Sequence, residues 1–173
     1  ERLGTESAFA ILAEAKKIEA TGKKMINLGI GQPDFKTPTH VMEAAKKAID
    51  DGHHGYVVSN GIPECREAVC RKIKKLYGAD IHSDRIIIMP GGKPTMYFAI
   101  SMFGEPGVEI IYPDPGFPVY ESMINYTGAK AVPYSILDNK DLKFDPEKIL
   151  SLINEKTRML VIINPNNPTG SFV

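Results

Sequence analysis

With 173 residues, 43% of them hydrophobic and 24% charged, the chain has the length and composition of one globular domain or of a piece of a larger one. Its 21 basic and 21 acidic residues balance, so no net charge favours nucleic acid or an anionic membrane surface. No apolar run approaches the length that a bilayer requires. From the balanced charge and the absence of such a run, we expect neither nucleic acid nor a membrane as a partner.

Three helices are expected in the first 77 residues. The apolar residues of the first helix share one face, and they are Ala8, Ile11, Leu12, Ala15 and Ile18. This helix should end at Thr21-Gly22, and a short strand is expected at Met25–Leu28. Thr37-Pro38 is typical of a helix start, with Thr37 as the cap, and predicts a helix that runs to about Asp51. The third helix should span Ile62–Tyr77.

From Arg85 onward the pattern alternates between strands and helices. The apolar runs that predict strands are Ile86–Met89, Val108–Tyr112, Ala129–Tyr134 and Met159–Ile163. The segments between them that predict helices are Pro94–Phe103, Val119–Tyr126 and Pro146–Asn154. This alternation predicts an α/β fold in which helices flank a parallel-rich sheet.

The most informative motif, Asn164-Pro-Asn-Asn-Pro-Thr-Gly170, directly follows the last apolar run. Its two Asn-Pro steps force a sharp, extended turn, and they place amide side chains at the sheet edge where open α/β folds bind ligands. The motif resembles the signature of class I pyridoxal-phosphate (PLP) aminotransferases of fold type I. In that family the Asn before Pro-Thr-Gly, here Asn167, hydrogen-bonds the ring oxygen of PLP and contributes to substrate binding. At least one Asn-Pro bond, foremost Asn167-Pro168, is expected to be cis.

A second motif, Pro90-Gly-Gly-Lys93, lies between an expected strand and an expected helix, where backbone N–H groups can approach an anion. It is not a Walker A loop, because the required Gly and Ser or Thr are replaced by Ile87 and Pro94. Taken alone, it is also compatible with an ordinary strand-to-helix turn. The resemblance implies that Gly92 and Lys93 hold the phosphate of PLP.

A third motif, Pro113-Asp-Pro-Gly-Phe-Pro-Val-Tyr120, forms a proline-rich, rigid turn that carries Phe117. PLP requires a flat apolar surface against its ring, and aromatic stacking contributes about 0.5–1.5 kcal/mol. Phe117 could equally be a core residue. The resemblance implies that it is the stacking residue, at a position where many relatives carry Trp or Tyr.

Two further segments resemble the same family. Leu28–Phe35 resembles a loop on the substrate-carboxylate side of the family's site, which places Gly31 against the substrate. This loop is not a dinucleotide-binding loop, because Asp34 stands where a third glycine is required. Tyr56 and Asn60–Arg66 match the family's Tyr-x4-Gly-x3-Leu-Arg pattern. In the family that Tyr reaches the phosphate of the neighbouring subunit, which implies a homodimer.

The remaining reactive side chains give no site of their own. Cys65 and Cys70 are the only cysteines, and five positions apart on a helix they are poor disulfide partners. Cys65 takes the place of the Leu in the pattern above. Without a signal-peptide pattern, the cysteines fit a reducing, cytoplasmic location. The four histidines lack ligand spacing, so no metal site is expected.

The resemblance implies the three-layer α/β/α fold of type I PLP-dependent transferases, incomplete at its C-terminus. We expect residues 1–35 to form the N-terminal helix and substrate-side loop of a small domain. Residues 36–173 should be the N-terminal part of the large PLP-binding domain. The run Ile86–Met89 should lack sheet neighbours here. In the family's fold, the strands that separate it from the rest of the sheet come after the Asn-Pro motif.

Transamination requires a Lys that forms a Schiff base with PLP, an acid beside the pyridine nitrogen and an Arg that clamps the substrate carboxylate. In the family all three follow the Asn-Pro motif, and their motifs are not in this sequence. Lys93 matches the phosphate loop, so no catalytic residue is assigned. We expect an N-terminal portion of a protein about twice as long, inactive by itself.

The intact protein is expected to be a PLP-dependent aminotransferase that transfers an amino group between an amino acid and a 2-oxo acid. Two alternatives stay open: a PLP-dependent lyase or synthase of the same fold, and a non-catalytic fragment that keeps part of the cofactor site. A Lys motif beyond Val173 would favour an enzyme over the fragment.

Overall fold

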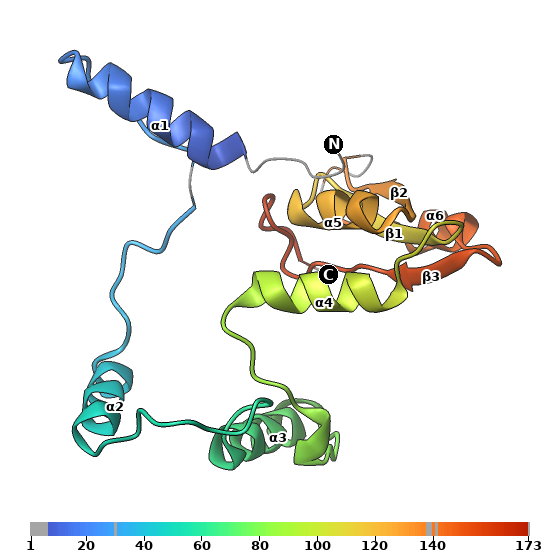
Figure 1. The fold of residues 1–173 in the computed structure, drawn as a ribbon. Helices are drawn as coiled ribbons and strands as arrows, with labels where there is room; N and C mark the ends of the chain where they lie inside the picture. Colours follow the sequence, from blue (N-terminus) through green and yellow to red (C-terminus); the bar gives the residue numbers. More distant parts are fainter. Residues whose placement is uncertain (1–6, 30, 138–139, 141, 173) are drawn as a thin grey trace. The chain divides into compact units, whose positions relative to one another are not determined.

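The computed structural model describes residues 7–29, 31–137, 140 and 142–172 (Figure 1). The chain divides into two compact units. One comprises Glu1–Met25 and Gly91–Val173, and the other comprises Ile26–Pro90. The domain limits 1–35 and 36–173 stay a prediction.

The first unit contains a three-stranded parallel sheet (Figure 1). Its strands are β1 (Glu109–Asp114), β2 (Lys130–Ser135) and β3 (Thr157–Leu160), in the order β2-β1-β3. The central strand β1 is buried except at its last residue. This burial explains why its sequence is a continuous apolar run, because a central parallel strand is covered on both faces. Three of the four strands expected after Arg85 are therefore confirmed.

Helices cover both faces of this sheet. They are α4 (Gly92–Phe103), α5 (Val119–Thr127) and α6 (Pro146–Leu152). Successive residues of a strand point to opposite faces, and Ile110 and Ile111 belong accordingly to two separate core clusters. Ile110 packs with Ile100 of α4 and Ile124 of α5, whereas Ile111 packs with Ile149 of α6. The unit therefore has an α/β/α arrangement, as expected.

Two expected strands do not form among the described residues. Met25–Leu28 and Ile86–Met89 have no strand partner, and Ile88 N donates instead to Asn60 O at 3.1 Å. The prediction of strands at these runs was wrong, because β propensity requires a hydrogen-bonded neighbour to form a sheet. Leu28 is 91% exposed and Ile87 is 65% exposed. The isolation of Ile86–Met89 matches the expectation that it lacks sheet neighbours.

The remaining elements are α1 (Ser7–Ala20), α2 (Thr39–Asp50), α3 (Pro63–Tyr77) and the short 3₁₀ helix η1 (Ser83–Arg85). The three helices expected in this part are confirmed within a few residues. The cap of α2 is Pro38, without a side-chain hydrogen bond, so the expectation of a Thr37 cap was wrong. The α3 helix ends at Gly78 in the left-handed conformation that glycine favours.

A buried arginine holds the second unit together around Gly61. Arg66 is 9% exposed, and its guanidinium donates to Gly61 O at 3.0 Å and to Ser83 O at 3.1 Å. Gly61 has a φ of 98°, and an added Cβ would lie 2.6 Å from Ile88 Cγ1. Both the backbone conformation and the space at this position therefore require glycine.

We expect Gly61→Ala to lower the free energy of unfolding of the full-length protein by at least about 2 kcal/mol, because strain and overlap with Ile88 add. Gly55→Ala is the matched control, since Gly55 has no positive φ and no atom within 4 Å of the added Cβ. Urea denaturation measures both variants. Equal midpoints would show that the contact with Ile88 relaxes without cost.

At the start of β1, the buried carboxylate of Glu109 joins three segments. Its Oε1 accepts from Lys130 Nζ at 2.8 Å, and its Oε2 accepts from Asn154 Nδ2 at 2.8 Å. The hydrogen bond from Lys130, and then that from Asn154, outweigh burial and lower the pKa of Glu109. The charged carboxylate is therefore the form that the fold stabilises.

Because the pKa of Glu109 is lower in the folded state, its contribution to stability is present above its unfolded pKa and is lost as pH falls through the folded value. We expect Glu109→Gln to destabilise the full-length protein at pH 7 and to have little effect at acidic pH below the folded pKa. Glu155→Gln, at an exposed position, is the charge-matched control. Denaturant titrations at both pH values test this, and an equal loss at both would contradict it.

Candidate functional site

The N-terminus of α4 is open to an anion. Gly91 is its cap residue, with a φ of 96° and no side-chain hydrogen bond to the first turn. The helix begins at Gly92, two residues before the expected start at Pro94. The N–H groups of a first helical turn have no partner within the helix, and the helix dipole favours negative charge there. Gly92 and Lys93 are both exposed at this end.

The turn after β1 brings an aromatic ring to the same place. Phe117 is half-buried, directly before α5, and Lys93 Nζ lies 5.8 Å from the centre of its ring. Gly116 permits this turn, because a Cβ there would lie 2.3 Å from Pro113 O. The structure therefore brings together three residues that the sequence assigned to one cofactor, Gly92, Lys93 and Phe117.

The Asn-Pro turn leaves the sheet at its carboxyl edge, the edge at which the turn after β1 also begins. Beyond β3, Val161 N still donates to Ile111 O at 2.8 Å, so the chain follows the parallel strand β1 toward its carboxyl end. Asn164-Pro165 and Asn167-Pro168 are both cis, which confirms that expectation. The side chain of Asn167 is exposed and therefore accessible to a ligand.

Gly31 and Tyr56 belong to the other unit, Ile26–Pro90. Within that unit both residues are exposed, and Gly31 has no atom within 4 Å of an added Cβ. Their assignment to the substrate and to the neighbouring subunit's cofactor stays a prediction.

The family model for aminotransferases of class I and II matches residues 23–173. The chain belongs to this family. It is 44% identical to an aspartate aminotransferase of Pyrococcus horikoshii over 147 aligned residues. These residues make up 85% of this chain and 38% of that protein.

Solved structures show the same relation. An alanine aminotransferase from Pyrococcus furiosus superposes with a TM-score of 0.91 at 33% identity, over 97% of this chain and 44% of that one. An aspartate aminotransferase from Thermus thermophilus with maleate superposes with a TM-score of 0.90 at 32% identity, over 98% of this chain and 44% of that one. This chain therefore has the fold of type I PLP-dependent transferases, and it spans about two fifths of its relatives' length.

The site residues of this member of the family fit PLP by their chemistry. A helix N-terminus without a side-chain cap, with a lysine in its first turn, suits a phosphate, and the aromatic ring 5.8 Å from that lysine suits a flat heterocycle. Among the described residues, no group of three or more His, Cys, Asp or Glu could hold a metal ion. None of the described helices has the length and apolar character to cross a membrane.

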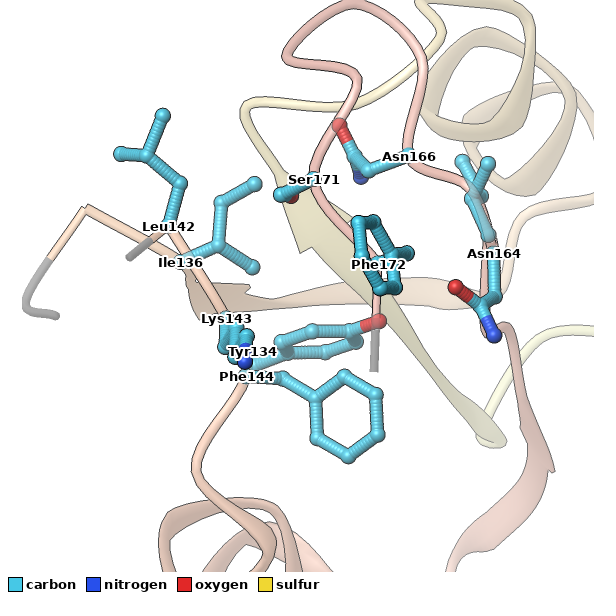
Figure 2. Close-up of a pocket in the computed structure, with 10 residues that line it drawn as sticks. Tyr134, Ile136, Leu142, Lys143, Phe144, Asn164, Asn166, Ser171 and Phe172 are labelled. Carbon is cyan, nitrogen blue, oxygen red and sulfur yellow. The ribbon is translucent and has the colours of Figure 1, made fainter. Parts of the chain in front are cut away.

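The sequence motifs did not predict a small pocket that lies behind the Asn-Pro turn (Figure 2). It is lined by Tyr134, Ile136, Leu142, Lys143, Phe144, Ile163, Asn164, Asn166, Ser171 and Phe172. Tyr134 donates from its hydroxyl to Val161 O at 3.1 Å, and burial raises its pKa to about 12. Buried Asn166 was the other omission, because a run of three amides in one turn does not reveal which of them faces inward.

Proposed function

We propose that the full-length protein is a PLP-dependent aminotransferase that transfers an amino group between an amino acid and a 2-oxo acid. One observation carries this proposal. The N-terminus of α4 lies beside the ring of Phe117, with Lys93 Nζ 5.8 Å from the ring centre. The chain that carries this arrangement belongs to the family of class I and II aminotransferases. An anion site beside an aromatic surface matches a phosphate attached to a heterocycle.

Each site residue has a separate task. The backbone N–H of Gly92 and the ammonium of Lys93 hold the phosphate, because both supply positive charge at the start of α4. Phe117 excludes water from one face of the ring and fixes its plane. Asn167 donates a hydrogen bond to the ring oxygen and faces the substrate. Gly31 leaves room for the substrate.

When bound, PLP supplies an electron sink for the negative charge that develops on the substrate's α-carbon. The lysine, the acid and the arginine that this chemistry also requires are expected outside these 173 residues. We assign proton transfer to none of the residues in this chain. The proposed role of this portion is to bind and orient the cofactor.

We further propose a homodimer in which Tyr56 reaches the phosphate bound by the neighbouring subunit. Its full exposure within its own unit supports this, because its hydroxyl is accessible to a second chain. The two cysteines, both free, agree with a cytoplasmic location.

Removing the hydroxyl with Tyr56→Phe is expected to weaken PLP binding by about tenfold, because a hydrogen bond to a charged group is lost. Tyr77→Phe, an exposed tyrosine at the end of α3, is the matched control. Equilibrium dialysis measures the affinity, and sedimentation measures the assembly. A full-length monomer that holds PLP tightly would contradict the shared site.

A product analysis tests the proposed reaction. The full-length protein is incubated with PLP, an amino acid and a 2-oxo acid, and the new amino acid is identified by mass spectrometry. Aspartate and alanine are the first donors to try, because the relatives are named for them. Transfer of the amino group supports the proposal. Cleavage or replacement of the amino acid's side chain would favour a lyase or synthase. The absence of any product would favour a non-catalytic protein that keeps part of the cofactor site.

A further inference from the structure

The Asn-Pro turn contains a buried amide that the proposed function does not use. Asn166 is 8% exposed, although its neighbours Pro165 and Asn167 are exposed. A buried polar side chain requires hydrogen-bond partners, and its position next to Asn167 makes those partners informative.

Asn166 closes the turn through both its side chain and its backbone. Its Oδ1 accepts from Thr169 N at 3.3 Å and from Thr169 Oγ1 at 3.0 Å. Its backbone N donates to Ser171 O at 2.8 Å, and its backbone O accepts from Gly170 N at 2.8 Å. Figure 2 shows Asn166 and Ser171 on the two arms of this turn.

A second contact reinforces this closure. The hydroxyl oxygens of Thr169 and Ser171 lie 2.8 Å apart, within hydrogen-bonding distance. Thr169 Oγ1 therefore links the Asn166 amide to the far arm of the turn. Only Asn167 and Pro168 lie between Asn166 and Thr169, so the hydrogen bonds fix both ends of a two-residue segment.

We propose that Asn166 is a positioning residue for Asn167, which rests on the proposed role of Asn167 toward PLP. The Asn166–Thr169 bonds hold the backbone of Asn167 while its side chain stays exposed for the ligand. Holding the backbone in advance removes an ordering cost from ligand binding. Without the Oδ1 atom, two donors of Thr169 lose their acceptor and the segment loosens.

The test compares variants of the full-length protein. Asn166→Ala is expected to weaken PLP binding by about fivefold, the loss of roughly one net hydrogen bond. It should also shift the pKa of the bound cofactor's visible absorbance in the same direction as Asn167→Ala. Because Asn166 acts through Asn167, adding Asn166→Ala to Asn167→Ala should cause no further shift.

Thr169 provides a second, independent pair of variants. Thr169→Val removes the hydroxyl that donates to Asn166 and should reproduce the direction of both effects, whereas Thr169→Ser keeps it and should restore both values. These variants keep the proposal testable if Asn166→Ala fails to fold. Thermal unfolding without PLP is measured alongside, to separate stability from positioning.

A lower melting temperature with unchanged PLP affinity and an unchanged absorbance pKa would show a structural role only and overturn the inference. Additive shifts in the Asn166→Ala/Asn167→Ala variant would overturn it as well. A wild-type protein that binds no PLP overturns the proposed function together with this inference. A wild-type protein that binds PLP, with Asn166 and Thr169 variants that match it, overturns the inference alone.

Discussion

Replacing Asn167 by alanine in the full-length protein is expected to weaken PLP binding by about 10- to 150-fold. A hydrogen bond to a charged acceptor contributes about 1.5–3 kcal/mol, which corresponds to that range. The side chain is exposed at the sheet edge where the turn leaves β3, so truncation removes a donor without opening a cavity in the core. Equilibrium dialysis and the pH dependence of the cofactor's visible absorbance measure the effect.

Two variants separate the donor from other causes. Asn167→Asp keeps the size of the side chain but removes its N–H donors, so it should weaken binding at least as much as alanine. Asn125→Ala removes an exposed amide in α5 and should leave PLP binding unchanged. An alanine variant whose affinity and absorbance pKa equal those of the wild type would remove Asn167 from the site.

The 173-residue chain expressed alone is expected to show no transamination and no cooperative unfolding. The chemical reason is that it lacks the motifs for the lysine, the acid and the arginine. The physical reason is exposed apolar surface, with Ile26, Leu28 and Ile87 at 82%, 91% and 65%. Each such side chain forgoes about 1.5–3 kcal/mol of burial, and the net stability of a domain is only about 5–15 kcal/mol.

Borohydride reduction with PLP, followed by peptide mapping, tests the chemical part of this prediction. The full-length protein should carry a pyridoxyl label, and Lys93 should not be its site. Circular dichroism during urea titration tests the physical part. A label on Lys93, or a sharp unfolding transition of the 173-residue chain, would contradict the corresponding part.

The sequence pattern correctly predicted the strands whose pairing strands lie within the same part of the chain. Apolar runs separated by helical segments predicted β1, β2 and β3 because each strand pairs with a neighbour inside the same unit. The run Ile86–Met89 has the same apolar character but no partner, so it forms no strand among the described residues. Pairing is a tertiary property that local propensity does not contain.

The same distinction applies to the site. The motifs led to Gly92, Lys93 and Phe117, and the structure brings them together where α4 begins beside the turn after β1. Buried Asn166 was missed, since composition alone does not distinguish it from exposed Asn167. Its burial and the hydrogen bonds from Thr169 reveal its different environment.

The most direct test of the proposed transamination is the visible absorbance of the full-length protein during the two half-reactions. With PLP bound, addition of an amino acid donor should abolish the visible band, and later addition of a 2-oxo acid should restore it. Reversal of this kind is the expected signature of amino-group transfer from the amino acid to the 2-oxo acid. A protein without a bound cofactor, or a band that neither substrate changes reversibly, would contradict an aminotransferase.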